Sequence, residues 1–161
     1  MSKSAPWFAG AAAIVLADQL TKWLVLARFA PGERLELSSF FNMILVFNKG
    51  AAFSFLAAAP GWQTPLLAAF ALGAALVVSV LLLRSPQRRM LCAGLALILG
   101  GALGNLVDRL RFGQVVDFLD FHAAGWHWPA FNVADSAITL GAALLILDGL
   151  RRHEKRAGAP S

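Results

Sequence analysis

The sequence predicts a membrane all-α bundle of four transmembrane helices, with a small extracytoplasmic β-sheet (a cradle) in the first outer loop. Three observations predict this class. Hydrophobic residues make up 58% of the 161 residues and charged residues only 14%, whereas soluble domains average about 25% charged residues. Four apolar segments approach the ~20 residues that a transmembrane helix requires. The segment between the first two alternates polar and apolar residues, which is typical of strands.

The predicted helices and loops form a single integral membrane domain over residues 1–161. The helices are expected at residues 6–27, 64–83, 90–107 and 133–150, and the outer loops at 28–63 and 108–132. The third and fourth helices are short for a membrane span, so we expect their ends close to the interfaces. The first is long enough to span and carries Asp18 and Lys22, which disfavours a cleavable signal peptide.

Basic residues mark one end of the predicted bundle. Eight of them flank the helices there, against the single acid Glu154. They are Lys3, Arg84, Arg88, Arg89, Arg151, Arg152, Lys155 and Arg156. The positive-inside rule therefore places both termini in the cytoplasm and the two longer loops outside. The formal net charge of +5 follows from this asymmetry, and it predicts membrane orientation and no nucleic-acid partner.

The first outer loop carries strand and turn signals. Glu33 to Leu37 alternates polar and apolar residues, and Phe40 to Phe47 is rich in β-favouring residues. Pro31-Gly32 predicts a turn before them. The apolar and aromatic stretch from Phe53 to Trp62 is expected in the membrane interface. In the second loop, the tryptophans at positions 126 and 128 are expected at the same level, and the tail after residue 156 is expected to be disordered.

Four of the nine acidic residues fall between positions 104 and 136: Asp108, Asp117, Asp120 and Asp135. Charged groups beside lipid are costly, and they are therefore functional candidates. Taken alone, Asp117 could be a solvated loop residue, and Asp135 could serve the electrostatics of a helix start. Together, both lie at the same predicted membrane depth, beside amides and apolar residues. This joint placement favours a site.

Two carboxylates within hydrogen-bond reach cannot both ionise easily, so such a pair shares one proton near neutral pH. The ionised member can take a proton from a water that attacks a peptide carbonyl, while the protonated member donates to the carbonyl oxygen. This chemistry needs no metal, serine or cysteine. The chain has neither a Gly-x-Ser-x-Gly elbow nor a His-Glu-x-x-His motif.

Two further polar groups interrupt the apolar helices. Asp18 and Lys22 are four residues apart, so they share a helix face and can pair. In the third helix, Gly101, Asn105 and Asp108 fall on one stripe with the next residue, Arg109, and glycines on this helix permit close helix packing. Each group is either a structural packing face, capped in the third helix by an Asp108–Arg109 pair, or a support for a site.

Other classes of function remain open at this point. Asp117, Asp120, His122 and His127 lie within eleven residues, but their spacing matches no standard zinc pattern. The lone cysteine, Cys92, lies in an apolar run, without a partner for a disulfide or an activating base. Buried carboxylates could instead relay protons or bind cations in a small channel or transporter. The polar stripes could also serve only to pack helices in an assembly or lipid-binding protein.

Five motifs in order resemble those of the lipoprotein signal peptidase (signal peptidase II) family of bacteria. They are DQLTK from Asp18, NKGAAF from Asn48, GNLVDR from Gly104, VDF from Val116 and FNVADS from Phe131. Each motif alone is weak evidence. Five of them in this order, combined with four spans, are highly specific, and the resemblance covers nearly the whole chain.

The resemblance implies roles for particular residues. Asp117 and Asp135 match the catalytic dyad of an aspartic endopeptidase. The substrate-binding or supporting positions are Asp18, Lys22, Asn48, Gly50, Asn105, Asp108, Arg109, Asn132 and Ala134. No metal or cofactor is implied. The first outer loop is expected to form the cradle and a short segment that closes over the substrate.

The resemblance also implies a substrate and a location. The substrate is a prolipoprotein with a diacylglyceryl cysteine, which is cleaved just before that cysteine to release the signal peptide. Membrane lipid and globomycin-type inhibitors are the other expected partners. The enzyme is expected in the bacterial cytoplasmic (inner) membrane as a multi-pass protein, with its active site at the outer face.

Overall fold

The computed structural model describes residues 3–50 and 61–157. Four helices in this part of the chain are long and apolar enough to cross a membrane: α1 (Ala5–Leu26), α2 (Gln63–Arg84), α3 (Arg89–Phe112) and α4 (Val133–Ala157). The predicted four-helix class is therefore confirmed. Most of the predicted interfacial stretch after Phe53, with the segment expected to close over the substrate, lies outside the described residues, as does most of the C-terminal tail.

The third helix is longer than predicted. It continues beyond residue 107 to Phe112, so Asp108 and Arg109 are helical and not part of a loop. Residues 108–112 contain no glycine or proline that would end the helix. Gly113 adopts a left-handed conformation (φ 70°) and ends the helix with a hydrogen bond from its N–H to the carbonyl of Arg109. The polar stripe of this helix therefore lies on one rigid element.

The cradle is a four-stranded sheet in the order β1 (Arg34–Ser38), β2 (Phe41–Asn48), β3 (Val115–Ala123) and β4 (Trp126–His127). The sequence predicted a sheet formed by the first outer loop alone. This prediction was incomplete, because β3 and β4 come from the second loop. A two-stranded hairpin leaves an edge unpaired, and β3 covers that edge of β2. The antiparallel register places Val46 opposite Asp117 and Asn48 opposite Val115.

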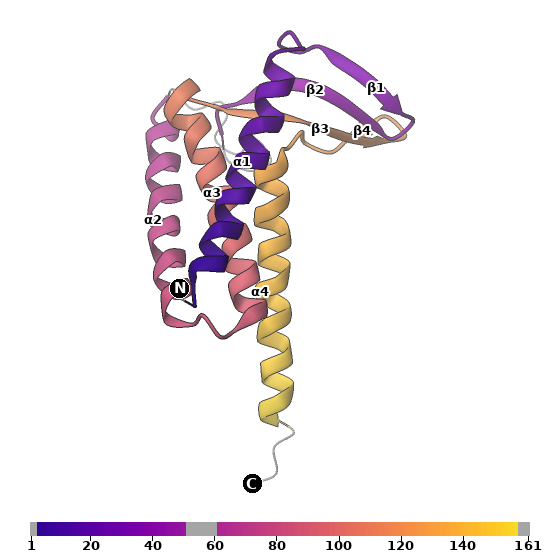
Figure 1. The fold of residues 1–161 in the computed structure, drawn as a ribbon. Helices are drawn as coiled ribbons and strands as arrows, with labels where there is room; N and C mark the ends of the chain where they lie inside the picture. Colours follow the sequence, from indigo (N-terminus) through magenta and orange to yellow (C-terminus); the bar gives the residue numbers. More distant parts are fainter. Residues whose placement is uncertain (1–2, 51–60, 158–161) are drawn as a thin grey trace.

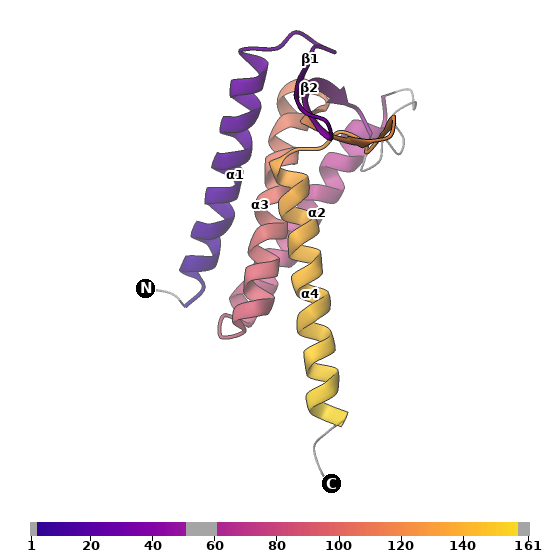
Figure 2. The same ribbon diagram turned by 90° about the vertical axis from the view of Figure 1, so that its right-hand side faces the viewer.

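The sheet lies across one end of the helical bundle (Figure 1). The start of α1, the end of α4 and the α2–α3 connection lie at the opposite end. Turned by 90°, the molecule shows α3 between α1 and α4 (Figure 2). Helix α3 contacts each of the other three helices and is the centre of the bundle.

Two apolar clusters hold these elements in place. The first joins α1, α2 and α3 through side chains such as Leu82, Leu95 and Leu99. The second joins Val25, near the end of α1, to Leu45, Val116 and Phe118 of the sheet. Val116 and Phe118 of β3 are 0% and 4% exposed. Because they flank Asp117 in sequence, the second cluster fixes the part of the strand that carries this aspartate.

Two glycines of α3 permit its close approach to neighbouring elements. A Cβ atom on Gly101 would clash with the backbone carbonyl of Ala134 in α4. A Cβ atom on Gly104 would lie 2.7 Å from Oδ2 of Asp18 in α1. The prediction that glycines on this helix permit close packing is confirmed, and the contacts bring α1, α3 and the first turn of α4 together.

Candidate active site

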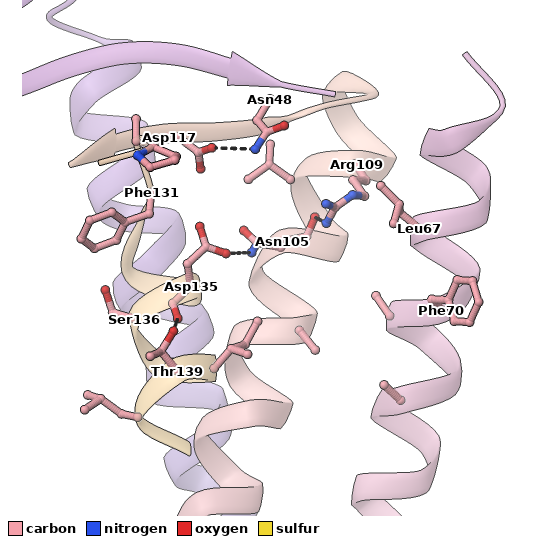
Figure 3. Close-up of a pocket in the computed structure, with 18 of the residues that line it drawn as sticks. Asn48, Leu67, Phe70, Asn105, Arg109, Asp117, Phe131, Asp135, Ser136 and Thr139 are labelled. Atoms are coloured by element: carbon pink, nitrogen blue, oxygen red, sulfur yellow. Dashed lines mark hydrogen bonds between the residues drawn. The ribbon is translucent and has the colours of Figure 1, made fainter. Parts of the chain in front are cut away.

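Asp117 of β3 and Asp135 in the first turn of α4 line the same cavity of about 790 Å³. Their carboxylates point into this space, which lies below the sheet and between α2 and α4 (Figure 3). The polar lining residues include Asn48, Asn105 and Arg109, whereas α2 contributes only apolar side chains. These are Leu67, Phe70, Ala71 and Ala74. The cavity therefore has a polar end beneath the sheet and an apolar wall.

Asp117 is buried, with 2% of its surface exposed, and two amides contact it. Asn48 donates from Nδ2 to Oδ2 of Asp117 at 3.1 Å, and Asn132 donates from Nδ2 to Oδ1 at 2.7 Å. Burial, followed by the nearby negative charge of Asp135, raises the pKa of Asp117 to about 7, although both amides oppose this change. At neutral pH this carboxyl group can therefore both donate and accept a proton.

Asp135 is held by the residues around the start of α4. Asn105 donates from Nδ2 to Oδ1 of Asp135 at 2.8 Å. The backbone N–H of Asn132 donates to Oδ2 of Asp135 at 3.3 Å, and the N–H of Asp135 donates to Oδ1 of Asn132 at 2.9 Å. This reciprocal pair has the form of a capping box. Asn132 therefore caps α4 and contacts both aspartates, which links their positions.

Arg109 lines the cavity but does not pair with Asp108. Its guanidinium donates to the carbonyl of Gly50 at 3.0 Å and to the carbonyl of Asn105 at 3.4 Å. The predicted Asp108–Arg109 pair is therefore wrong. Consecutive residues of a helix point in directions about 100° apart, so one cannot face the other. Gly50 enters the site through its carbonyl, and its N–H donates to Oδ1 of Asn48 at 2.9 Å.

A buried charged layer lies behind the cavity. Nζ of Lys22 lies 2.8 Å from Oδ2 of Asp18 and 2.7 Å from Oδ2 of Asp108, and all three side chains are at most 2% exposed. The predicted pairing of Asp18 and Lys22 is confirmed. Asp108 joins them because α3 is helical at this point and turns this carboxylate toward α1.

The structure thus separates the predicted residues into two groups. Asn48, Asn105, Arg109, Asp117 and Asp135 line the cavity. The others lie around it: Asp18, Lys22, Gly50, Asp108, Asn132 and Ala134.

Sequence reasoning did not assign Gln19, Ser136 or Thr139 to the site. Gln19 donates to Oδ1 of Asp108 at 2.8 Å. Its position beside Asp18 in the first motif could have indicated this role. Ser136 and Thr139 line the cavity on the same side as Asp135. The apolar wall of α2 gave no signal, because apolar residues occur along the whole helix.

Asp120 forms a separate cluster away from the cavity. It accepts hydrogen bonds from Asn42 at 2.9 Å and from Nδ1 of His127 at 2.9 Å, with Arg34 at 3.9 Å. His122 contacts Oδ1 of Asn42 instead of the carboxylate. Within residues 3–50 and 61–157, no group of three or more His, Cys, Asp or Glu side chains is arranged to hold a metal ion.

Fold and site define a polytopic membrane protein with a buried carboxylate, Asp117, and a half-buried one, Asp135, in a cavity at one end of its bundle. The family model described as signal peptidase (SPase) II matches residues 10–151. The chain therefore belongs to the signal peptidase II family, a family of proteases, as its motifs predicted. This membership decides against the channel, transporter and packing alternatives.

Relatives and solved structures agree with this assignment. The lipoprotein signal peptidase of Paraburkholderia phytofirmans is 60% identical over 148 residues, which are 92% of this chain and 86% of that protein. That of Burkholderia vietnamiensis is 57% identical over 92% of this chain and 89% of its own. A solved bacterial membrane enzyme superposes with a TM-score of 0.85 at 26% identity, covering 98% of this chain and 94% of that one. A second reaches 0.79 at 28% identity, over 91% and 93% of the two chains.

Proposed function

We propose that this chain is a lipoprotein signal peptidase that uses Asp117 and Asp135 as an aspartic catalytic dyad. Its family and the activity named for its relatives support the protease and its prolipoprotein substrate. The observation that carries the dyad is that both carboxylates line one cavity, joined through Asn132. The multi-pass bundle, taken as one domain over residues 1–161, belongs in the inner membrane of a bacterium.

In the proposed reaction, the ionised member of the dyad removes a proton from a water molecule as its oxygen attacks the scissile carbonyl carbon. The protonated member donates to the carbonyl oxygen and stabilises the tetrahedral intermediate. The intermediate collapses when the C–N bond breaks, and the amine leaves with a proton returned by the dyad. The pKa of about 7 for Asp117 supports this exchange at neutral pH.

The proposed substrate is a prolipoprotein with a diacylglyceryl cysteine, which is cleaved just before that cysteine. Backbone in lipid is helical and fully hydrogen-bonded, so it resists attack until it unwinds. The apolar sides of the cavity, from Leu67 and Phe70 on α2 to Ile138 on α4, suit an entering signal helix. Asn48, Asn105 and Arg109 then offer donors to the unwound backbone at the polar end. Globomycin-type inhibitors are proposed to occupy the same cavity.

The charge distribution supports an orientation with both termini in the cytoplasm and the active site at the outer face. The cavity's polar end lies beneath the sheet, at the end of the bundle opposite the start of α1 and the end of α4. We expect a reporter enzyme fused after residue 161 to be active only in the cytoplasm. Activity of the fusion on the exterior would reverse the orientation.

The dyad is tested by Asp117→Asn and Asp135→Asn, each assayed for cleavage of a lipidated precursor in detergent or vesicles. Each variant removes a proton-transfer group, and we expect the rate to fall about 10²–10⁴-fold. Asp120→Asn is the matched control, because it removes a buried carboxylate of the same strand that does not line the cavity. It should cleave at the wild-type rate. Near-normal cleavage by either dyad variant would contradict the assignment.

A further inference from the structure

Each aspartate of the dyad is preceded by a residue whose backbone N–H is held by a buried carboxylate. The N–H of Ala134, just before Asp135, donates to Oδ1 of Asp18 at 2.9 Å. The N–H of Val116, just before Asp117, donates to Oδ2 of Asp108 at 3.1 Å. The two carboxylates come from α1 and α3, so each one fixes the backbone of a different element beside the cavity.

The ammonium of Lys22 joins the carboxylates of Asp18 and Asp108, which we call the two anchors. Nζ of Lys22 pairs with Oδ2 of Asp18 and with Oδ2 of Asp108, at 2.8 and 2.7 Å. Gln19 occupies the remaining oxygen of Asp108 and also lies 3.3 Å from Oδ2 of Asp18. Every oxygen of both anchors therefore has a partner, and the position of each anchor depends on the same lysine.

A third contact of Lys22 connects it to Asp135 through one side chain, that of Asn105. Nζ donates to Oδ1 of Asn105 at 2.9 Å. An ammonium has donors only, so this contact fixes which end of the amide is the oxygen. Nδ2 of Asn105 must then face Asp135, to which it donates at 2.8 Å. Oδ1 of Asn105 also accepts from Asn132, which in turn contacts Asp117.

We propose that Lys22 is a positioning residue that sets the mutual placement of the two dyad carboxylates. It acts through Asp18 on the start of α4, through Asp108 on β3, and through Asn105 on the side chain of Asp135. This inference rests on the proposed dyad and gives a mechanistic role to a lysine that does not line the cavity. The alternative is that the ion pairs only stabilise the bundle.

Lys22→Met tests this role, because methionine keeps an unbranched side chain and removes all three donors. The assay measures kcat, KM and the pH–rate profile for a lipidated precursor, well below the melting temperatures of the proteins compared. We expect kcat to fall about 10- to 100-fold, since small misplacements of catalytic groups have effects of this size, while KM changes little. The profile should move to higher pH, because Asp18 and Asp108 become uncompensated beside the dyad, with Arg109 as the cation that still lines the cavity.

Arg88→Met is the matched control. Arg88 pairs with Asp148 of α4, so this variant also breaks an ion pair between helical segments, but at the end of the bundle away from the sheet. It should lower the melting temperature and leave kcat and the pH profile unchanged. If Lys22→Met behaves in the same way, Lys22 is only structural and the proposal fails.

A charge-balanced variant covers the case in which Lys22→Met does not fold. Asp18→Asn/Lys22→Met/Asp108→Asn keeps an oxygen acceptor for each backbone N–H and leaves no buried charge in the layer. The proposal predicts reduced kcat in this folded protein, and wild-type kcat would overturn it. Failure of the wild-type protein to cleave the precursor would instead refute the proposed function, so the two failures are distinguishable.

Discussion

Strand β3 carries two aspartates with little exposed surface but different partners. Asp117 and Asp120 are 2% and 4% exposed and lie three residues apart, on opposite faces of the strand. Asp117 receives two neutral amide donors, and the other carboxylate of the cavity lies nearby. Asp120 receives one amide donor and has His127 and Arg34 as cationic or proton-donating partners.

Their pKa values move in opposite directions. Burial raises the pKa of Asp117 to about 7, and the charge of Asp135 adds to this effect. Burial alone would also raise the pKa of Asp120, but hydrogen bonds from Asn42 and His127, together with the charge of Arg34, hold it below its ordinary value. The extent of burial and the charge of the partners together decide the direction, and the proton-donating and cationic partners of Asp120 outweigh its burial. Amide donors orient a carboxylate without neutralising its charge, which suits a group that must exchange a proton.

The largest expected difference between Asp117 and Asp120 is in the cleavage rate after one amide partner of each is converted to a carboxylate. Asn48→Asp keeps the oxygen that accepts from the N–H of Gly50 but replaces the donor to Asp117 with a like charge. We expect the pKa of Asp117 to rise further and precursor cleavage at pH 7 to fall at least about 10-fold, since a nearby like charge shifts a pKa strongly.

Asn42→Asp makes the same change beside Asp120, where His127 and Arg34 can compensate. This control should cleave at close to the wild-type rate. Equal losses in the two variants, measured as kcat/KM on the lipidated precursor, would show that the two aspartates do not differ as described.

A smaller effect is expected on stability as a function of pH. The pKa of Asp117 is raised from 3.8 to about 7, so between these values the folded chain holds a proton that the unfolded chain has released. Stability therefore falls as pH rises through this window and levels off above it. At about 1.36 kcal/mol per pH unit, the loss is at most about 4 kcal/mol. Melting curves in detergent from pH 4 to 9 should show this fall in the wild type and not in Asp117→Asn.

The pKa shift of Asp120 has the opposite effect on stability as a function of pH. Its lowered pKa adds stability above the ordinary value of 3.8, and this contribution is lost as pH falls below it. Asp120→Asn should therefore lose stability at neutral pH and approach the wild type in acid. Parallel pH profiles for the Asp117 and Asp120 variants would contradict the opposite signs.

Much of the site could be predicted from local sequence. The spacing of Asp18 and Lys22 follows from the helical repeat, and Asn132 and Asp135 occupy positions that a helix start favours. The motifs also placed Asp117 and Asp135 together. The partner of Asp108 was missed, because a helix end set by Gly113 turns this carboxylate toward α1 and away from its neighbour in sequence.

The sequence by itself determined the four apolar spans, the strands of the first outer loop and the identity of the candidate dyad. These features depend on composition, on short-range periodicity and on motifs that are visible along the chain. Only the tertiary structure decided that β3 completes the sheet, that α2 forms an apolar wall of the cavity, and that Lys22 joins the anchors of both aspartates. These features depend on which side chains packing brings together from distant parts of the chain, such as Lys22 and Asn105, which are 83 positions apart, and no local pattern encodes that choice.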